Sequence, residues 1–374
     1  MVAMRRPTRT VYVGKVAVGG DAPIRVQSMC DTDTRDVDAT VAQIHRLEEA
    51  GCEIIRVAVP DKKAAAVLHL IKSRIGIPLI ADIHFDYELA LASIDQGVDK
   101  VRINPGNIFV KAGRKGIEAV VLAAKQAKIA LRVGVNCGSI EPRLLEKYGY
   151  PTPEAAVESA LDHVRFCEDL DFHDMIVSVK FSEVPNMIRA YELLSAQIDY
   201  PLHLGVTEAG TPWSGTIKSS IGIGSLLAHG IGDTVRVSLT TPEKTDEVKV
   251  AYEILKSLEI RAHGPMLTAC PGCGRTEVDL LKLTADVEAA LASVQTPLRV
   301  AVMGCVVNGP GEAAEADLAV VGGRGRGAIY RKGKLLRTAN EDGLVPALLA
   351  EIANWTPAPE PERRAGVIPL RVRR

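Results

Sequence analysis

The chain has 374 residues, of which 47% are hydrophobic and 24% are charged, a composition typical of globular proteins and unlike that of disordered or fibrous chains. Its 45 Lys and Arg against 46 Asp and Glu leave a formal charge of -1, so no global field favours a nucleic acid or a membrane surface. No apolar run is long enough to span a membrane, and the first residues contain no apolar signal segment. We therefore expect a cytoplasmic protein with no nucleic-acid and no membrane partner.

Short β-branched runs alternate with helical patterns along most of the chain. Segments between the runs, such as residues 38 to 51 and 153 to 170, carry apolar residues at helical spacing. Repeated strand and helix units of this kind predict an α/β fold with an N-terminal (β/α)8 TIM-type barrel. The predicted strands are residues 24 to 29, 54 to 59, 79 to 85, 100 to 104, 130 to 136, 175 to 181, 202 to 208 and 234 to 240.

A doubly wound sheet is the competing architecture, and the polar residues of the later strands count against it. They fall at even spacing, and residues two apart share one face of a strand. The other face is Ile, Val or Leu, fit to pack under a helix, so the polar face should point into a barrel. The polar pairs are Asp82 and His84, Arg102 and Asn104, Arg132 and Asn136, Ser178 and Lys180, His203 and Thr207, and Arg236 and Ser238.

Polar inward positions on so many strands predict a wet, charged pocket at the mouth of the barrel. Some of its cations can pair with Asp82 or Glu208, but they outnumber those carboxylates. An excess of fixed positive charge favours an anion, and Arg guanidinium groups match phosphate oxygens. We therefore expect a phosphorylated substrate, with two phosphates favoured over one. The cations are Arg56, Arg102, Arg132, Lys180 and Arg236.

Three cysteines near the C-terminal end form a candidate metal site. Cys270 and Cys273 make a C-x-x-C motif, and Cys305 follows in a Gly/Pro-rich loop whose nearest hard ligand is Glu312. Zinc and an iron–sulfur cluster both suit thiolates on a tight turn, but a structural zinc site is usually closed by Cys or His. A [4Fe-4S] cluster with three thiolates and one weak oxygen ligand is therefore the favoured reading, because one iron can then exchange its ligand for substrate.

Other motifs have plainer interpretations. Four other cysteines are isolated in the sequence, and we interpret them as small, buried apolar side chains: Cys30, Cys52, Cys137 and Cys167. Of these, Cys30 and Cys137 can line the mouth of the barrel. The basic, glycine-rich run 322 to 338 could contact phosphate or RNA, but a glycine turn within a two-stranded hairpin accounts for it equally well, and a nucleic-acid partner is not expected.

A G-x-G pattern within residues 219 to 224 lacks the third glycine and the βαβ position of a dinucleotide fingerprint. We expect it to close a βα loop over phosphate.

The pattern changes after the eighth unit. The barrel is therefore assigned to residues 1 to 261 and an α+β iron–sulfur domain to residues 262 to 356. A Pro/Glu-rich and then basic tail, residues 357 to 374, is expected to be disordered.

Several motifs together resemble the bacterial 4-hydroxy-3-methylbut-2-enyl diphosphate synthases of the methylerythritol phosphate pathway. The most specific are CPGCGR and GCVVNGPGEA, and the resemblance covers about residues 8 to 350. This chain departs from the family pattern at Cys137, where a small residue is common, and in its basic tail. Neither departure touches the candidate metal ligands. The supporting barrel motifs are ADIHFD, VRINPGN, VGVNCGS, PLHLGVTEAG and IKSSIG.

The resemblance implies a two-electron reductive ring opening, with loss of water, of 2-C-methyl-D-erythritol 2,4-cyclodiphosphate. One [4Fe-4S] cluster per chain would be held by Cys270, Cys273, Cys305 and Glu312, and a flavodoxin or ferredoxin would supply the electrons. Glu208 would be the proton donor, with His84 and Asp82 orienting or relaying. The diphosphate would be held by Arg56, Arg102, Asn104, Arg132, Asn136, Lys180 and Arg236.

Two further expectations concern architecture and an alternative activity. The helix predicted at about residues 242 to 260 runs back to the barrel floor, and only residues 261 to 269 precede Cys270. The cluster domain therefore starts at the floor, and so short a connection leaves its cysteines short of the mouth of the same barrel. A head-to-tail homodimer, in which each cluster domain caps the partner's barrel, avoids this long path and is also what the resemblance implies. The rival reading is a zinc-containing TIM-barrel synthase or aldolase acting on a phosphorylated substrate.

Overall fold

The computed structural model describes residues 3–294, 296–305, 307 and 309–355. The chain separates after Arg261 into two compact units, which are described here one at a time. The tail predicted to be disordered lies outside the described residues. Among the described residues, no helix is both long and apolar enough to cross a membrane.

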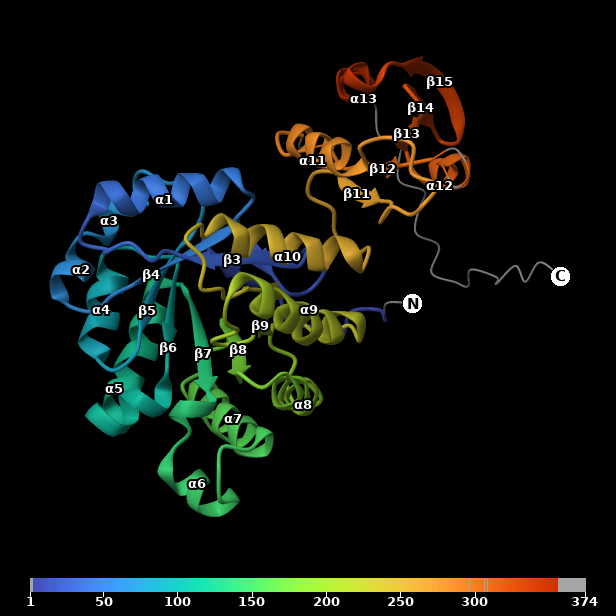
Figure 1. Cartoon of the computed structure of the whole chain (residues 1–374). Coiled ribbons are helices and arrows are strands. Elements are labelled where there is room, and N and C mark those ends of the chain that lie inside the picture. Colours follow the sequence, from blue (N-terminus) through green and yellow to red (C-terminus); the bar gives the residue numbers. More distant parts are fainter. Residues whose placement is uncertain (1–2, 295, 306, 308, 356–374) are drawn as a thin grey trace. The chain divides into compact units, whose positions relative to one another are not determined.

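The first unit is a barrel of eight parallel strands wrapped by helices (Figure 1). Hydrogen-bonded neighbours follow the order β8-β7-β6-β5-β4-β3-β10-β9, and a bridge between Val177 and Leu202 joins the two ends of this sheet. The predicted (β/α)8 barrel is therefore confirmed. Its strands are β3 (Arg25–Met29), β4 (Ile54–Ala58), β5 (Leu79–Ile83), β6 (Lys100–Ile103), β7 (Ala130–Asn136), β8 (Met175–Lys180), β9 (His203–Leu204) and β10 (Thr234–Val235).

The helices of this unit begin at capping residues that the sequence supplies. Asp36, Asp61 and Thr152 each accept a backbone N–H in the first turn of the helix that follows them. Apolar faces of these helices pack on the outward Ile, Val and Leu residues of the strands. The helices are α1 (Val37–Glu49), α2 (Lys62–Ala66), α3 (Leu68–Lys72), α4 (Tyr87–Asp95), α5 (Pro105–Ala127), α6 (Pro142–Tyr148), α7 (Pro153–Asp169), α8 (Val184–Ser195), α9 (Pro212–Ala228) and α10 (Thr245–Ser257).

The floor of the barrel is closed by an N-terminal hairpin of β1 (Val11–Val13) and β2 (Val16–Val18). Its valines form a buried cluster with the first inward residues of four strands. The floor is therefore apolar, and a substrate pocket is expected at the opposite end, where the strands end. The strand residues in this cluster are Ile54, Ile80, Ala130 and Ile176.

Strands β9 and β10 are shorter than predicted. Single backbone bonds continue the pairing past their ends: Arg236 N donates to Leu204 O at 2.9 Å, and Thr207 N donates to Phe181 O at 3.2 Å. Glu208 has φ 51°, which is incompatible with an extended strand, so the extended backbone stops there.

The expectation for the G-x-G pattern is wrong. Gly222 and Gly224 lie inside α9 rather than in a βα loop. A Cβ on Gly222 would lie 3.0 Å from Val206 and 3.2 Å from Met187, so the missing side chain lets α9 pack closely on the barrel. These glycines serve helix packing, which a phosphate-loop interpretation overlooked.

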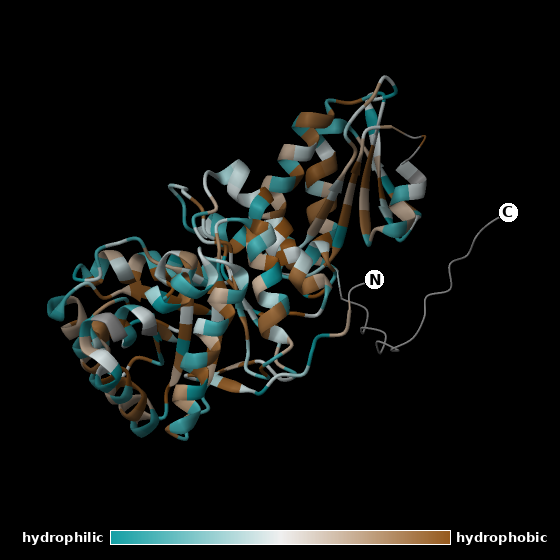
Figure 2. Cartoon of the chain, turned by 90° about the horizontal axis from the view of Figure 1, so that it is seen from below, coloured by the Kyte–Doolittle hydropathy of each residue, from teal (hydrophilic) through white to brown (hydrophobic). Residues whose placement is uncertain are grey.

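The second unit is a five-stranded sheet with helices on both faces. Its first three strands are parallel and the last two are antiparallel, which confirms the hairpin predicted in the basic run. Strand residues alternate between two apolar clusters, one under α11 and α13 and one under α12, and apolar residues dominate these strands in Figure 2. The elements are β11 (Met266–Ala269), β12 (Arg299–Met303), β13 (Leu318–Gly323), β14 (Arg326–Arg331), β15 (Lys334–Ala339), α11 (Leu280–Leu291), α12 (Gly309–Glu315) and α13 (Leu344–Ala353).

Candidate active site and metal centre

Asp82 lies at the centre of a charged cluster inside the barrel. Its Oδ1 is 3.3 Å from Arg102 Nη1, and its Oδ2 is 3.7 Å from Arg56 Nε. His84 Nε2 approaches the same Oδ2 to 3.3 Å from the mouth. The side chains of Asp82, Arg56 and Arg102 are at most 8% exposed. These polar side chains therefore point into the barrel, as their spacing predicts. The pairing of β5 with β6 aligns Asp82 beside Arg102.

The cations around Asp82 determine its ionisation. Burial by itself raises the pKa of this carboxyl, but Arg56, His84 and Arg102 outweigh that effect and hold the pKa well below its usual range. Asp82 is therefore a carboxylate at neutral pH. It acts as a fixed counter-ion rather than as a proton donor.

The opposite wall of the barrel carries cations with less compensation. Arg132 Nη1 donates to Ser178 Oγ at 3.2 Å, and neither Arg132 nor Lys180 has a carboxylate within ion-pair distance among the described residues. Arg236 Nη2 lies 3.6 Å from Glu247 Oε2, a residue of α10. Burial lowers the pKa of Lys180 well below its ordinary value, and Arg132 and Arg236 lower it further. An anion entering the mouth would relieve this repulsion.

Two strand glycines make room for these long side chains. A Cβ on Gly134 would lie 3.0 Å from Arg102 Nε, and a Cβ on Gly205 would lie 2.7 Å from Lys180 Nζ. Both distances are shorter than ordinary contacts between carbon and nitrogen. The interior is therefore shaped to hold the cations across from each other.

The remaining predicted barrel residues lie at the mouth. Asn104 Nδ2 donates to Ser139 Oγ at 2.7 Å, and the same hydroxyl accepts from the backbone N–H of Asn136 at 3.2 Å. Ser139 thus ties the two asparagines together, a role that the sequence interpretation missed. Glu208 is exposed in the loop after β9 in a left-handed conformation that is uncommon for a residue with a side chain. Among the described residues, no hydrogen bond or ion pair joins Glu208 to the Asp82 cluster.

Two of the isolated cysteines follow barrel strands at this mouth. Cys30 is buried directly after β3, and Cys137 is half-buried after β7. Burial raises the pKa of Cys137, and the charges of Glu183 and Glu208 raise it further. Burial likewise raises the pKa of Cys30, so both cysteines are neutral thiols.

Several interior polar residues were absent from the predicted site. Lys100 and His203 are fully buried, and Gln27 is 1% exposed. Lys100 lies two residues before Arg102 on the same face, so the even spacing that identified the other cations was a sufficient signal for it.

Glu247 was missed for a different reason. It reaches the interior from α10, accepts from Ser28 Oγ at 3.2 Å and takes the Leu239 backbone N–H at 3.0 Å. The spacing of polar residues along the strands cannot reveal an interior carboxylate that comes from a helix.

The candidate metal ligands of the second unit gather at one edge of its sheet. Cys270 directly follows β11, and Cys305 comes two residues after β12, its parallel neighbour. The carboxyl ends of parallel strands meet at the same edge. Cys273 is held in a tight turn, its N–H donating to Thr276 Oγ1 at 3.0 Å, and the Glu277 N–H donates to Gly304 O at 3.0 Å. This turn therefore lies across the end of β12.

Glu312 is brought to this edge by α12. The Gly309 N–H, at the start of α12, donates to Cys305 O at 3.3 Å, which ties the start of the helix to the cysteine. Glu312 lies in the first turn of this helix. A Cβ on Gly309 would lie only 2.3 Å from Val321, which shows how closely the helix start packs on β13.

Three thiols and one carboxyl at one sheet edge fit the donor set of an iron–sulfur cluster. Within the described ranges, no three His, Cys, Asp or Glu side chains are close enough to hold a single metal ion.

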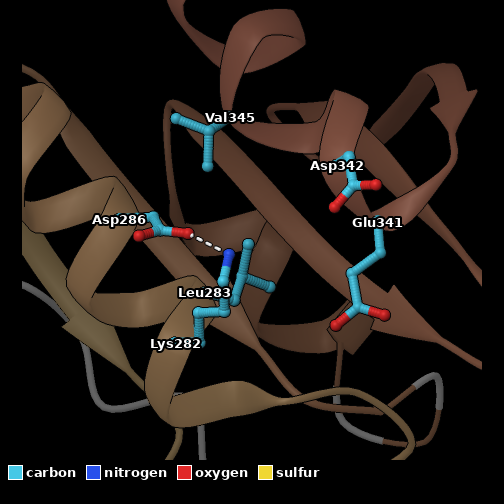
Figure 3. Close-up of a pocket in the computed structure, with 6 residues that line it drawn as sticks. All are labelled: Lys282, Leu283, Asp286, Glu341, Asp342 and Val345. Atoms are coloured by element: carbon cyan, nitrogen blue, oxygen red, sulfur yellow. Dashed lines mark hydrogen bonds and ion pairs between the residues drawn. The ribbon is translucent and has the colours of Figure 1, made fainter.

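A hollow elsewhere in the second unit contains none of the predicted site residues (Figure 3). It lies between α11 and the start of α13, and Lys282 Nζ in it is paired with Asp286 at 2.8 Å. Glu341 and Asp342 add two further carboxyl groups to its wall. Since its one amine is already paired, we assign it no part in the site.

The fold and the mouth define a (β/α)8-barrel enzyme for a phosphorylated substrate, joined to a thiol-rich α+β unit. Two family models match the chain: the GcpE TIM-barrel domain over residues 8–252 and the GcpE protein C-terminal domain over residues 266–354. The chain belongs to the GcpE family.

Curated relatives agree over nearly the whole length. A 4-hydroxy-3-methylbut-2-en-1-yl diphosphate synthase (flavodoxin) of Geobacillus thermodenitrificans is 55% identical over 93% of this chain and 92% of its own. One of the same name from Caldanaerobacter subterraneus is 56% identical over 94% of this chain and 98% of its own.

Among solved structures, a Yersinia pestis dihydropteroate synthase matches with a TM-score of 0.50 and 10% identity. It covers 68% of this chain and 100% of its own. At that identity the likeness is one of fold alone.

Proposed function

We propose that this chain is a 4-hydroxy-3-methylbut-2-en-1-yl diphosphate synthase. It converts 2-C-methyl-D-erythritol 2,4-cyclodiphosphate to (E)-4-hydroxy-3-methylbut-2-enyl diphosphate in isoprenoid biosynthesis. The substrate dianion, two electrons and one proton give the product trianion and one water. The observation that carries the proposal from the chain's own residues is the excess of inward cations at a mouth whose buried carboxylates, Asp82 and Glu247, are already paired.

The barrel residues divide the work between binding and proton transfer. Arg56, Arg102, Arg132, Lys180 and Arg236 bind the diphosphate by charge-assisted hydrogen bonds, and Asn104 and Asn136 add neutral ones. Asp82 keeps Arg56 and Arg102 in place, with His84 above it at the mouth. Glu208 donates the proton to the departing hydroxyl, since it is the exposed carboxyl in the loop after β9.

The second unit supplies the ligands for one [4Fe-4S] cluster per chain. Cys270, Cys273 and Cys305 would hold three irons, and Glu312 would hold the fourth more weakly. Such a cluster would supply one-electron transfer at the mouth of the barrel.

A flavodoxin is the electron donor we favour, because the relatives' names include it, and a ferredoxin is the second choice. The zinc-containing synthase or aldolase is not favoured, since the relatives are named as 4-hydroxy-3-methylbut-2-en-1-yl diphosphate synthases (flavodoxin).

We also propose that the enzyme works as a head-to-tail homodimer. Arg261, the last residue of the barrel unit, donates to Ile24 O at 2.9 Å and pairs with Glu53 at 2.6 Å. Both partners directly precede strands, so the chain leaves the barrel at its floor. The short connection after Arg261 does not limit a partner chain, which can place its cluster unit over the mouth of this barrel.

The decisive experiment is to purify the chain without oxygen and measure its metal content and activity. We expect a brown protein with about four irons and four sulfides per chain. It should convert the cyclic diphosphate when supplied with reduced flavodoxin. A colourless protein with stoichiometric zinc and no such activity would refute the proposal.

Replacing Glu312 with Cys is expected to separate cluster binding from turnover. A fourth thiolate would hold every iron tightly, so the cluster absorbance should remain while turnover falls by about a hundredfold or more. Iron content, visible absorbance and initial rate check this. A Glu315→Cys chain, altered one turn further along α12, is the matched control and should retain activity. Wild-type turnover by Glu312→Cys would mean that the substrate never needs the fourth iron.

A further inference from the structure

Lys100 is a lysine of the barrel interior that the proposed mechanism leaves unused. Its side chain is 0% exposed, and Nζ has no hydrogen-bond partner among the described residues. In the sheet it is aligned with Ile80 and Ala130, both part of the apolar floor cluster. Its neighbour on the same face, Arg102, is one level nearer the mouth. A lysine side chain is long enough to bring Nζ up to that level.

The charges nearest to Lys100 are cations. Burial holds its pKa well below the ordinary value, and Arg132 and Arg56 lower it further. The two interior carboxylates are engaged elsewhere: Asp82 with Arg56 and Arg102, and Glu247 with Arg236 and Lys244. The ionisable groups that face the interior around Lys100 are Arg56 on β4, Asp82 on β5, Arg102 on β6, Arg132 on β7, Lys180 on β8, His203 on β9 and Arg236 after β10.

The proposed reaction changes the charge of the bound ligand, and the following inference rests on that proposed function. A cyclic diphosphate has one ionised oxygen on each phosphorus. Ring opening breaks a carbon–oxygen bond and leaves a terminal phosphate whose second ionisation has a pKa of about 6. At neutral pH the product therefore carries one negative charge more than the substrate.

We propose that Lys100 is an uncharged amine in the empty barrel and takes up a proton when the ring-opened diphosphate is bound. The amine lone pair accepts a proton from solvent, no other bond forms or breaks, and the proton leaves again with the product. The resulting ammonium offsets the charge that ring opening adds. Lys100 is thus a positioning residue for charge balance, and product affinity depends on pH through it.

The test is isothermal titration of product into the holoenzyme at pH 8, without reductant, in two buffers of different ionisation enthalpy. The product is fully ionised at that pH, so the proton uptake belongs to the protein. We expect the wild type to take up about one proton more than a Lys100→Met chain. The substrate dianion should give a smaller difference.

The pH dependence gives an independent measurement. Because binding takes up a proton, the dissociation constant of the product should rise with pH, by up to about tenfold per unit in the wild type. This rise should be reduced in Lys100→Met. In Lys100→Arg, whose charge is permanent, it should also be reduced while product affinity is better retained.

Lys256→Met is the matched control, since Lys256 is almost as buried but pairs with Glu253 on α10. It should keep the wild-type proton count. An unchanged proton count in both Lys100 variants would overturn the inference while leaving the proposed function intact. If the wild type neither converts nor binds the cyclic diphosphate, it is the proposed function that fails.

Discussion

An Asp82→Asn substitution is expected to lower the free energy of unfolding by about 3 to 5 kcal/mol, because it leaves buried cations without their counter-ion. The Asp82 carboxylate is 4% exposed and is approached by Arg56, Arg102 and His84. An amide has nearly the same shape but no charge, so Arg56, Arg102 and Arg132 would repel one another without compensation. Binding of the diphosphate product, which supplies negative charge at the mouth, should restore part of the lost stability.

Urea denaturation of the barrel, with and without product, measures this effect. The matched control is Asp199→Asn, since Asp199 also accepts from an arginine, Arg9 at 2.8 Å, but the pair lies at the surface. Exposed ion pairs contribute about 1 kcal/mol or less, so the control should change little. Equal losses in the two variants would show that burial of the Asp82 pair has no special weight.

The depressed pKa of the Asp82 carboxyl predicts that the free energy of unfolding falls in acid. Its folded-state pKa is depressed, so its contribution is present above the unfolded pKa of about 3.9 and is lost as the pH falls through the folded value. In Asp82→Asn this contribution to the acid-induced loss of stability should be absent. The difference between the two chains should therefore be largest near neutral pH and shrink in acid.

The even spacing of polar residues predicts from the sequence which side chains share the inward face of the barrel. A strand fixes which side chains share a face, and closing the sheet turns that face inward, so Asp82 and Arg102 lie side by side inside the barrel as their spacing predicts. The motif C-x-x-C with one later cysteine likewise identified residues that the fold gathers at one sheet edge.

What the sequence interpretation missed depends on contacts between distant elements. Glu247 enters from a helix, and Ser139 links the two asparagines from a short turn. The residues of the G-x-G pattern allow either a phosphate loop or a packed helix face, and only the packing of α9 distinguishes the two. The left-handed backbone of Glu208, which ends the extended run after β9, is likewise not revealed by any strand pattern.

The connection between the two units favours a site shared by two chains. The barrel unit ends at Arg261 beside the residues that begin β3 and β4, which is the floor. Only residues 262 to 265 precede β11, and Cys270 is nine residues from Arg261, a reach of about 30 Å at full extension. Within one chain, that reach would have to cover the height of the barrel wall and then the layer of helices. The height is at most about 23 Å, the length of the seven tilted residues of β7. The predicted helix of residues 242 to 260 is shorter than expected, α10 ending at Ser257, but its return to the floor stands.

A mixture of two inactive chains, Cys305→Ser and Glu208→Gln, is therefore expected to regain activity once subunits exchange. Each homodimer lacks either the cluster or the proton donor in both sites. In the heterodimer, one site combines the intact barrel of the first chain with the intact cluster unit of the second. Random exchange of equal amounts makes half of the dimers mixed, with one good site of two, so about a quarter of wild-type activity should return.

The initial rate with reduced flavodoxin, before and after exchange, measures the recovery, and native mass spectrometry of a tagged chain shows that exchange has occurred. A Cys305→Ser chain mixed with a Cys273→Ser chain is the control. Both defects then lie in the cluster unit, so no site of any dimer is complete and no activity should return. Recovery in the first mixture alone requires that barrel and cluster come from different chains. Proven exchange without recovery would instead place each cluster over its own barrel, and the short connection after Arg261 would have to span the full height of the wall.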